Sequence, residues 1–312
     1  MKKLLLGLLL LSPLAAYPFL RDDRDVCLPP NLNIPNPGPP PLTQDERLVL
    51  GSLAFLPGQA FPGAIPWGPL RDIGEQRTKV MDDLARTRPL AFLEHCLEHY
   101  KKEVAGYRVL FLKQERVQGK LRPKEKIVAH FREKPFSVHM NWLEGRARAI
   151  RTLYVQGEND DKLVARIMFG RFESPLLISR RTDDPEALAT SRFTIREFGI
   201  FKGAENTVNA MKKAQQIGTL SVRYEGIVPL SQVGERLCYK FVRSPYDPKD
   251  WETDLDKEEK LNELTIYIDR EMLMQVGSVL KDTEGNLIAE YFFRVIDLNP
   301  QFDARQFTQK KL

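Results

Sequence analysis

The segment from His95 to His99 carries residue types that are able to hold a catalytic metal. It fits the pattern H-x-x-E-H, in which two histidines on one helical face bind zinc and the glutamate activates water. On a helix, however, His95 and His99 project away from the apolar stripe that includes Leu97. A surface position gives a catalytic metal no dry, shaped cavity. We therefore keep a zinc-dependent hydrolase using His95, Glu98 and His99 as an alternative, and expect neither catalysis nor a cofactor.

The three cysteines are Cys27, Cys96 and Cys238. In an oxidising compartment Cys96 and Cys238 are candidates for a disulfide, which leaves Cys27 as an odd thiol. A second interpretation stays open, in which Cys96 is a small buried apolar side chain.

We interpret two further groups of polar residues as ordinary surface features. His130 and His139 are expected on the polar sides of neighbouring strands, where they meet across the ladder as an outward-facing pair. The aspartates between residues 247 and 256 lack the mid-loop glycine of an EF-hand, so we interpret them as a solvated acidic loop.

The first residues have the order of a secretory signal peptide. Lys2 and Lys3 precede an apolar run, Leu4–Leu11, and small residues follow up to Ala16. The run is too short to span a bilayer, which needs about 20 residues. We expect cleavage near Ala16 and a mature chain without a transmembrane helix, in the periplasm or outside the cell.

The charge of the chain is mildly positive. The formal net charge is +5, and it falls to about +3 when the signal peptide is removed, without a dense basic stripe. We therefore expect no nucleic-acid partner, although the excess is compatible with an anionic surface nearby.

Residues 17–86 are punctuated by proline, which fixes φ and removes backbone donors. We expect an extended tether there, interrupted by one short helix that a capping-box pattern places just after Thr43. The folded domain is then expected to span residues 87–312, as a monomer.

From residue 107 onward the apolar pattern has a period of two, after a helix expected between about 89 and 105. About ten such runs follow, joined by polar turns, and a second helix is expected between about 204 and 217. There is no alternation of strands and helices that would indicate a parallel sheet. These patterns predict an α+β fold that is mostly antiparallel β. Because strand twist accumulates, we expect a curved, incompletely closed barrel with helices plugging its concave face.

Several stretches of the sequence resemble stretches of the LolA/LolB-type lipoprotein carriers. The resemblance rests on three stretches taken in order: the start of the sheet at Phe111–Arg116, the hairpin Lys134-Pro135-Phe136, and the closing Leu298-Asn299-Pro300. Within that superfamily the chain looks most like an uncharacterised group of secreted proteins from planctomycete-type bacteria. The resemblance implies an unclosed barrel with an apolar cavity for acyl chains, and no catalysis. At Lys134 the carriers have an arginine that helps to hold the closed state, and lysine lacks its planar fork.

Large apolar side chains recur on one face of the expected strands, and they are candidates to line a cavity or to fill an ordinary core. The apolar candidates are Phe111, Phe131, Phe136, Val138, Met140, Trp142, Tyr154 and Met168. The resemblance adds Lys134 as a ninth candidate. The hypothesis that follows is an exported, non-enzymatic binding or carrier protein for a lipid, acyl chain or similar apolar ligand. A structural module that contacts an envelope protein or a membrane surface is the alternative from a different class.

Overall fold

The computed structural model describes residues 71–312, apart from Arg171 and Glu252. The expected signal peptide, most of the tether with its short helix, and Cys27 therefore lie outside the described residues. Within residues 71–312, no helix is both long enough and apolar enough to span a membrane.

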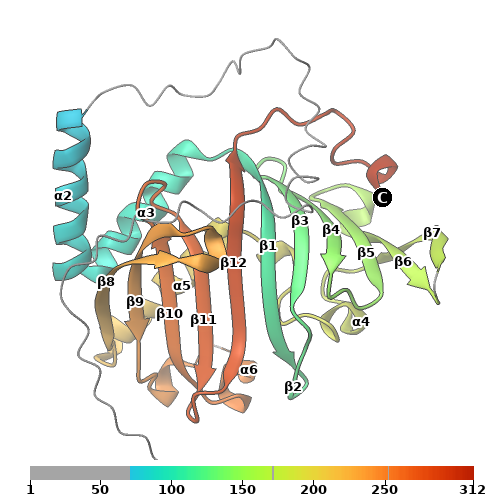
Figure 1. Cartoon of the computed structure of the whole chain (residues 1–312). Coiled ribbons are helices and arrows are strands. Elements are labelled where there is room, and N and C mark those ends of the chain that lie inside the picture. The colour runs from blue at the N-terminus through green and yellow to red at the C-terminus, as the bar shows by residue number, and fades with distance from the viewer. Residues whose placement is uncertain (1–70, 171, 252) are drawn as a thin grey trace, which may run out of the picture. The chain divides into compact units, whose positions relative to one another are not determined.

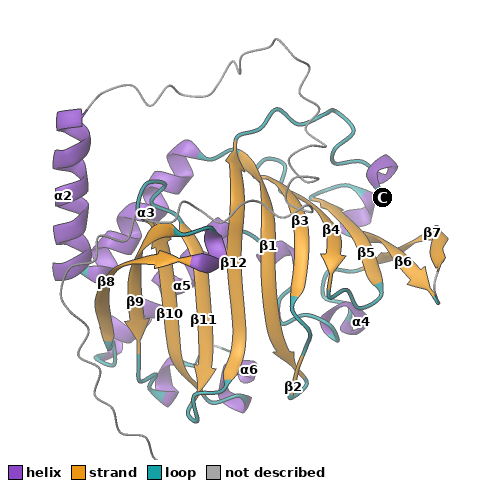
Figure 2. Cartoon of the chain, viewed as in Figure 1, coloured by secondary structure: helices purple, strands orange, loops and turns teal. Residues whose placement is uncertain are grey.

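The strands form one antiparallel layer (Figures 1 and 2). Their order is β7-β6-β5-β4-β3-β1-β12-β11-β10-β9-β8, and the short β2 pairs with β1. The strands are β1 (Gly106–Val117), β2 (Lys120–Leu121), β3 (Glu125–Arg132), β4 (Ser137–Glu144), β5 (Ala149–Val155), β6 (Leu163–Phe169), β7 (Phe172–Arg180), β8 (Val222–Leu230), β9 (Arg236–Arg243), β10 (Leu261–Asp269), β11 (Gln275–Asp282) and β12 (Leu287–Leu298).

This topology confirms the expected fold class. The edge strands β7 and β8 do not pair with each other in the described part of the chain, so the sheet stays open. The sequence predicted about ten strands, and the described residues form twelve. The two that were missed are β2, which has only two residues, and β7, which contains Pro175. A proline inside a strand is tolerated at an edge, and β7 is one.

Helices cover one face of the sheet (Figure 2). The α-helices are α2 (Arg71–Thr87), α3 (Pro89–Glu103), α4 (Pro185–Leu188), α5 (Ile200–Ile217) and α6 (Asp254–Glu258), and the short 3-10 turns are η1 (Asn159–Asp161), η2 (Ile195–Glu197), η3 (Ser231–Val233), η4 (Pro248–Asp250) and η5 (Gln309–Lys311). Helix α3 begins with Pro89, whose fixed φ suits the first helical position. Helix α5 ends at Gly218, which has the left-handed conformation (φ 78°) that glycine adopts without strain.

Helix α2 departs from the expected domain boundary. Residues 71–86 were assigned to the tether, but Met81 and Ala85 are buried in the same core cluster as the apolar face of α3. Asp82 accepts hydrogen bonds from the Tyr239 hydroxyl (2.7 Å) and from Nη2 of Arg270 (2.7 Å). Helix α2 therefore packs against the core on the N-terminal side of the boundary expected at residue 87.

The cysteines do not form the disulfide that the sequence left open. Cys96 and Cys238 are both free and buried. They belong to different core clusters, Cys96 on the buried face of α3 and Cys238 with Val276 and Phe292. Burial raises the pKa of the Cys238 thiol to about 12 and that of Cys96 further, so both behave as apolar side chains.

The acidic loop after β9 is not fully solvated, because Asp250 is buried with Arg243. Nη2 of Arg243 lies 2.5 Å from Oδ2 of Asp250, and the Arg243 guanidinium stacks 3.7 Å over the Tyr246 ring. The pair ties the loop to β9, since a buried charge is stable only with its partner.

The segment from Asn299 to Leu312, which we call the C-terminal segment, covers the outer face of β3 to β6. Phe307 and Leu312 pack with Leu153, Val155 and Val164. Beneath this segment His130 and His139 face each other in register, with ring centroids 5.6 Å apart. The predicted cross-strand pair is thus confirmed, but the C-terminal segment covers it, with His139 buried and His130 half-buried.

Burial lowers the pKa of both histidines. The pKa of His130 is lowered to about 3 by burial and, secondarily, by the charge of His139. The pKa of His139 is lowered to about 4 by burial, against a hydrogen bond with the Lys311 backbone. Nδ1 of His139 also lies 3.1 Å from Nε2 of Gln306 in the C-terminal segment. Both imidazoles are therefore neutral in the folded state near neutral pH.

These pKa values predict that the folded protein loses stability in acid. Below about pH 6.5, the ordinary pKa of histidine, the unfolded chain binds protons that the folded chain does not. The free energy of unfolding therefore falls as the pH decreases from about 6.5 towards 4. Between about pH 7 and pH 5 each histidine contributes a loss of about 2 kcal/mol. Urea unfolding of a His130→Asn/His139→Asn variant should show a flatter dependence on pH than the unaltered chain. His95→Asn, on the exposed side of α3, is the control, and an equal flattening there would contradict the assignment.

Candidate functional site

A cavity of about 1010 Å³ lies between the concave face of the sheet and the segments that cross it. Strands from both halves of the sheet line it, so the sheet curves around it. Ile127, Ala165 and Ile178 come from the half that ends in β7, while Leu264 and Phe293 come from the other. The volume is at the upper end of what small-molecule sites occupy.

Helix α5 forms the wall opposite the sheet, through Gly203, Thr207 and Ala210. The other side of this helix is packed: Val208 and Met211 are buried against α3 and the strands β9 and β10. The helix therefore fills one part of the concave face and leaves the cavity beside it. The sequence predicted a helix here, and the structure shows that its other side faces the cavity.

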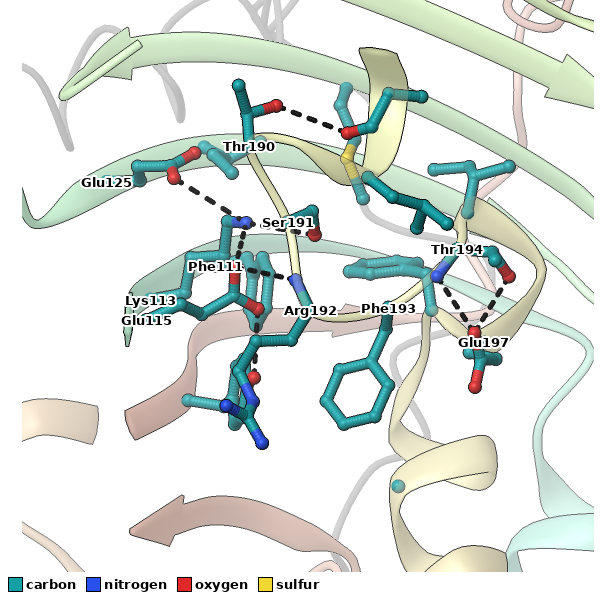
Figure 3. Close-up of a pocket in the computed structure, with 18 of the residues that line it drawn as sticks. Phe111, Lys113, Glu115, Glu125, Thr190, Ser191, Arg192, Phe193, Thr194 and Glu197 are labelled. Atoms are coloured by element: carbon teal, nitrogen blue, oxygen red, sulfur yellow. Dashed lines mark hydrogen bonds and ion pairs between the residues drawn. The ribbon is translucent and has the colours of Figure 1, made fainter. Parts of the chain in front are cut away.

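The chain between β7 and α5 crosses the cavity, and we call residues 182–199 the crossing segment (Figure 3). Phe198 anchors its far end in a group of aromatic rings, with centroids 5.3 Å from Phe111 and 6.2 Å from Phe293. Phe193 lies 6.1 Å from the Tyr291 ring. These contacts hold the segment across the apolar floor of β1 and β12.

Charged residues hold the middle of the crossing segment, in what we call the Lys113 cluster (Figure 3). Nζ of Lys113 donates to Oε2 of Glu115 (2.9 Å) and lies 3.5 Å from Oε1 of Glu125. The same nitrogen lies 3.5 Å from the hydroxyl of Ser191 on the crossing segment. Lys113, Glu115 and Glu125 have side chains that are at most 10% exposed, so these ion pairs are shielded from water.

Arg192 joins the cluster from the crossing segment. Its backbone N–H donates to Oε2 of Glu115 (3.4 Å), and its guanidinium pairs with Glu259 and lies 3.8 Å from Asp256. The Arg192 side chain is 1% exposed. Glu115 also accepts from the Tyr291 hydroxyl at 2.8 Å. Two cations and four carboxylates thus meet where β1, β3, the crossing segment and the region around α6 converge.

The cluster shifts the pKa of two of its members. Burial raises the pKa of Glu125, opposed by the charge of Lys113 and by a hydrogen bond from Nε1 of Trp142 (2.6 Å). Burial and the neighbouring Glu115 carboxylate raise the pKa of Tyr291 well above its ordinary value. The cluster therefore supports the crossing segment through paired charges, although Nε of Arg192 makes no hydrogen bond within the described residues.

Two polar atoms on the cavity wall stand apart from this network. Oγ1 of Thr152 and Oε1 of Gln275 are buried and make no hydrogen bond with the part of the chain that the structure describes. Arg148 lies at the cavity's edge and is exposed. The rest of the wall is mostly apolar, so the cavity suits a long apolar ligand with few polar groups.

Three of the nine predicted cavity residues line the cavity: Phe111, Met140 and Trp142. The others do not line it. Phe131, Val138 and Tyr154 are buried in the packed core, and Phe136 packs between the rings of Phe131 and Tyr154. Met168 is half-buried on β6, and Lys134 is exposed at the β3–β4 turn. The apolar row on one face of the sheet thus serves as core at one end and as cavity wall at the other.

The zinc-type motif does not form a metal site in the structure. His95 and Glu98 are exposed on α3, where Glu98 pairs with Lys101 at 2.8 Å. Among the described residues, no group of three or more His, Cys, Asp or Glu side chains is placed to hold a metal. The placement agrees with the helical-face argument, which turned both histidines away from the core.

The Lys113 cluster was missed by the sequence analysis, although one signal for it is present. Lys113 follows Val109 and Phe111 at a spacing of two, so it must share their buried face. A charged lysine on the buried face of a strand requires a buried partner. Its carboxylate partner Glu115 lies two residues further on the same face. Ser191 and the Arg192–Glu259 pair lie far along the chain, and no local pattern reveals them.

Comparisons with known proteins place this architecture in a family. The model of a family described as a protein of unknown function (DUF1571) matches residues 104–311. The chain belongs to the DUF1571 family. No curated protein matches the chain.

Similar solved structures share little sequence with the chain. The MucB chain of a Pseudomonas aeruginosa MucA/MucB complex is 12% identical, with a TM-score of 0.39, and the match covers 70% of this chain and 59% of that one. This chain thus spans less than two thirds of that protein's length. Lipoprotein LppX of Mycobacterium tuberculosis is 10% identical (TM-score 0.36, covering 66% and 92%). A LolA superfamily protein of Nitrosomonas europaea is 8% identical (TM-score 0.28, covering 70% and 98%).

The LolA superfamily, which the sequence resembles, thus appears among the structural neighbours at low identity. The narrower resemblance, to secreted proteins of planctomycete-type bacteria, receives no support from these comparisons. With identities and TM-scores this low, the function proposed below rests on this chain's own residues.

The Lys113 cluster predicts a large effect of one substitution. Glu115→Ala removes the acceptor for Lys113, Tyr291 and the Arg192 amide, and leaves buried donors without a partner. We expect the free energy of unfolding to fall by about 3–5 kcal/mol, measured by urea denaturation, and the Arg192 amide to exchange its hydrogen faster.

The matched control is Glu290→Ala on the outer face, where Glu290 pairs with Lys124, whose side chain is 76% exposed. An ion pair of this kind contributes at most about 1 kcal/mol. Equal losses of stability in the two variants would contradict the supporting role of the cluster.

Proposed function

We propose that this chain is a non-enzymatic binding or carrier protein that takes an apolar ligand with acyl chains into the cavity beneath the crossing segment. The observation that carries the proposal is the cavity of about 1010 Å³, which the protein's own helices leave open. Burying ten methylene groups there would contribute roughly 8 kcal/mol before the cost of association. Such a gain is enough for binding without many specific polar contacts.

The polar atoms of the wall narrow the ligand class. The charges of the Lys113 cluster have partners among themselves, so they do not call for a charged group deep in the cavity. Thr152 can donate to an ester or amide carbonyl, and Oε1 of Gln275 can accept from a hydroxyl. Arg148 at the edge suits an anionic head group. An acyl lipid with its head at the Arg148 end fits all three.

The rest of the proposal concerns the N-terminal residues. We infer that residues 1–16 direct export, that the proline-rich residues after them form a tether, and that the protein works in the periplasm or outside the cell. The alternative of a zinc hydrolase draws no support from the exposed positions of His95 and Glu98. The alternative of a contact with an envelope partner concerns the outer surface and is compatible with a ligand inside.

The cavity offers a substitution that fills it without unfolding the protein. A Cβ added at Gly203 would meet nothing closer than Nε2 of Gln275, at the ordinary contact distance of 3.7 Å. Gly203→Leu therefore places a side chain at the cavity wall, and replacing glycine within a helix adds up to about 1 kcal/mol of stability.

We expect Gly203→Leu to bind a fluorescent fatty acid, cis-parinaric acid, at least about tenfold more weakly, since room for two methylenes is worth that much. The control is Asn209→Leu, an exposed position of the same helix that does not line the cavity. Fluorescence titration measures both, and native mass spectrometry tests for lipid carried through purification. An unaltered chain that neither carries lipid nor brightens the probe would overturn the proposal.

A further inference from the structure

The hairpin formed by β6 and β7 carries the most exposed apolar side chains of the described residues. Phe169 is 78% exposed, Phe172 is 79% exposed and Leu176 is 72% exposed, whereas the next large apolar side chain, Val80, is 59% exposed. Phe169 and Phe172 are partners across the hairpin. Three large apolar groups thus gather on one element, where exposure in water is unfavourable unless something covers them.

The exposed side chains continue a row that lines the cavity. Leu163, Ala165 and Ile167 on β6 line it, and Phe169 is the next residue on the same face of the strand. On β7 the lining residue Ile178 is followed towards the tip by Leu176 and Phe172. An apolar path therefore leads from the cavity to the hairpin tip.

The hairpin also stands at the margin of the sheet. Strand β7 is an edge strand, and in Figure 1 β6 and β7 project from the right-hand end of the layer. Its pairing with β6 is irregular: Arg166 is opposite Leu177, but Met168 is opposite Glu173. Between these two pairs β7 has three residues, 174–176, and β6 has only Ile167, which indicates a bulge in β7. A bulged edge with a proline resists pairing with another strand, which disfavours an edge-to-edge protein contact.

The charge beside the hairpin is positive and unbalanced. Arg146 and Arg148 are exposed in the β4–β5 turn and make no side-chain hydrogen bond or ion pair with the rest of the described chain. The turn lies against β6, because the Met168 N–H donates to the Arg148 carbonyl oxygen (2.8 Å). The nearby acidic residues are engaged, since Glu144 pairs with Lys126 and Glu173 with Arg151 (3.3 Å each).

We propose that the tip of the β6–β7 hairpin, together with Arg146 and Arg148, docks on an anionic lipid bilayer. Phenylalanine and leucine side chains enter the boundary between head groups and acyl chains, and arginines beside them pair with lipid phosphates. The cavity edge then faces the bilayer, so an acyl chain can pass along the row from Phe169 to Leu163. This inference rests on the proposed function, for which it supplies the source of the ligand.

Vesicle flotation with the full chain tests the docking. The probes are vesicles of phosphatidylcholine alone and of phosphatidylcholine with phosphatidylglycerol. We expect binding to the anionic vesicles that weakens at high salt. Phe169→Ser/Phe172→Ser should lower this binding about tenfold or more. Arg146→Gln/Arg148→Gln should lower it about fivefold for each charge, or about 25-fold together.

Matched controls separate docking from general surface effects. Leu121→Ser/Ile217→Ser removes two exposed apolar side chains elsewhere, and Lys120→Gln/Arg305→Gln removes two exposed positive charges elsewhere. Both controls should bind vesicles like the unaltered chain. The four variants alter exposed positions, and thermal unfolding followed by circular dichroism checks that each is folded.

Each result has a distinct meaning. The docking proposal is overturned if the unaltered chain does not float with anionic vesicles. It is also overturned if Phe169→Ser/Phe172→Ser and Arg146→Gln/Arg148→Gln bind these vesicles as well as the unaltered chain does. A shift from dimer to monomer on Phe169→Ser/Phe172→Ser, without any vesicle binding, would assign the hairpin to protein contact and also overturn it. Uptake of cis-parinaric acid from solution tests the cavity separately. A Phe169→Ser/Phe172→Ser variant that keeps this uptake but loses vesicle binding supports both proposals, whereas vesicle binding without uptake by the unaltered chain removes only the cavity proposal.

Discussion

Lys113 and Glu115 place two charges on the apolar face of the central strand, and the architecture of the concave side depends on how these charges are satisfied. An unpaired buried charge is strongly unfavourable, whereas a pair with good geometry and further hydrogen bonds is tolerated. The two charges pair with each other, and further partners are Glu125 and, on the crossing segment, Ser191 and the Arg192 amide. The Arg192 guanidinium is held in turn by Glu259. The chain between β7 and α5 is therefore fixed across the sheet instead of collapsing onto its apolar floor.

This arrangement explains why a sheet of twelve strands leaves a large space inside. Helix α5 packs its apolar side on α3, β9 and β10, and the crossing segment is held by charges and by Phe198. Among the described residues, no α-helix of comparable length shares a core cluster with the inner face of β5 to β7. Ala165, Ile167 and Ile178 then face a cavity rather than a packed layer. An apolar cavity of this size gains free energy when a ligand with acyl chains enters it.

Local patterns in the sequence predicted the local structure and little beyond it. The period of two gave ten of the strands and the register that brings His130 opposite His139, because side chains alternate strictly along a strand. The pattern failed at β7, where Pro175 interrupts the period of two. It also could not separate Phe131, which is core, from Phe111, which lines the cavity. That difference depends on where the crossing segment lies, and contacts between distant residues decide it.

The exposed hairpin is best understood together with the open edge of the sheet. A curved sheet that does not close has an edge on each side, and natural proteins protect such edges with bulges, proline or charge. Strand β7 has a bulge and a proline, yet its tip keeps two phenylalanines exposed. Those two features hinder strand pairing, but they do not hinder insertion into a lipid surface, which needs no backbone partner. An edge protected against protein strands and still apolar at its tip is therefore suited to a bilayer more than to another chain.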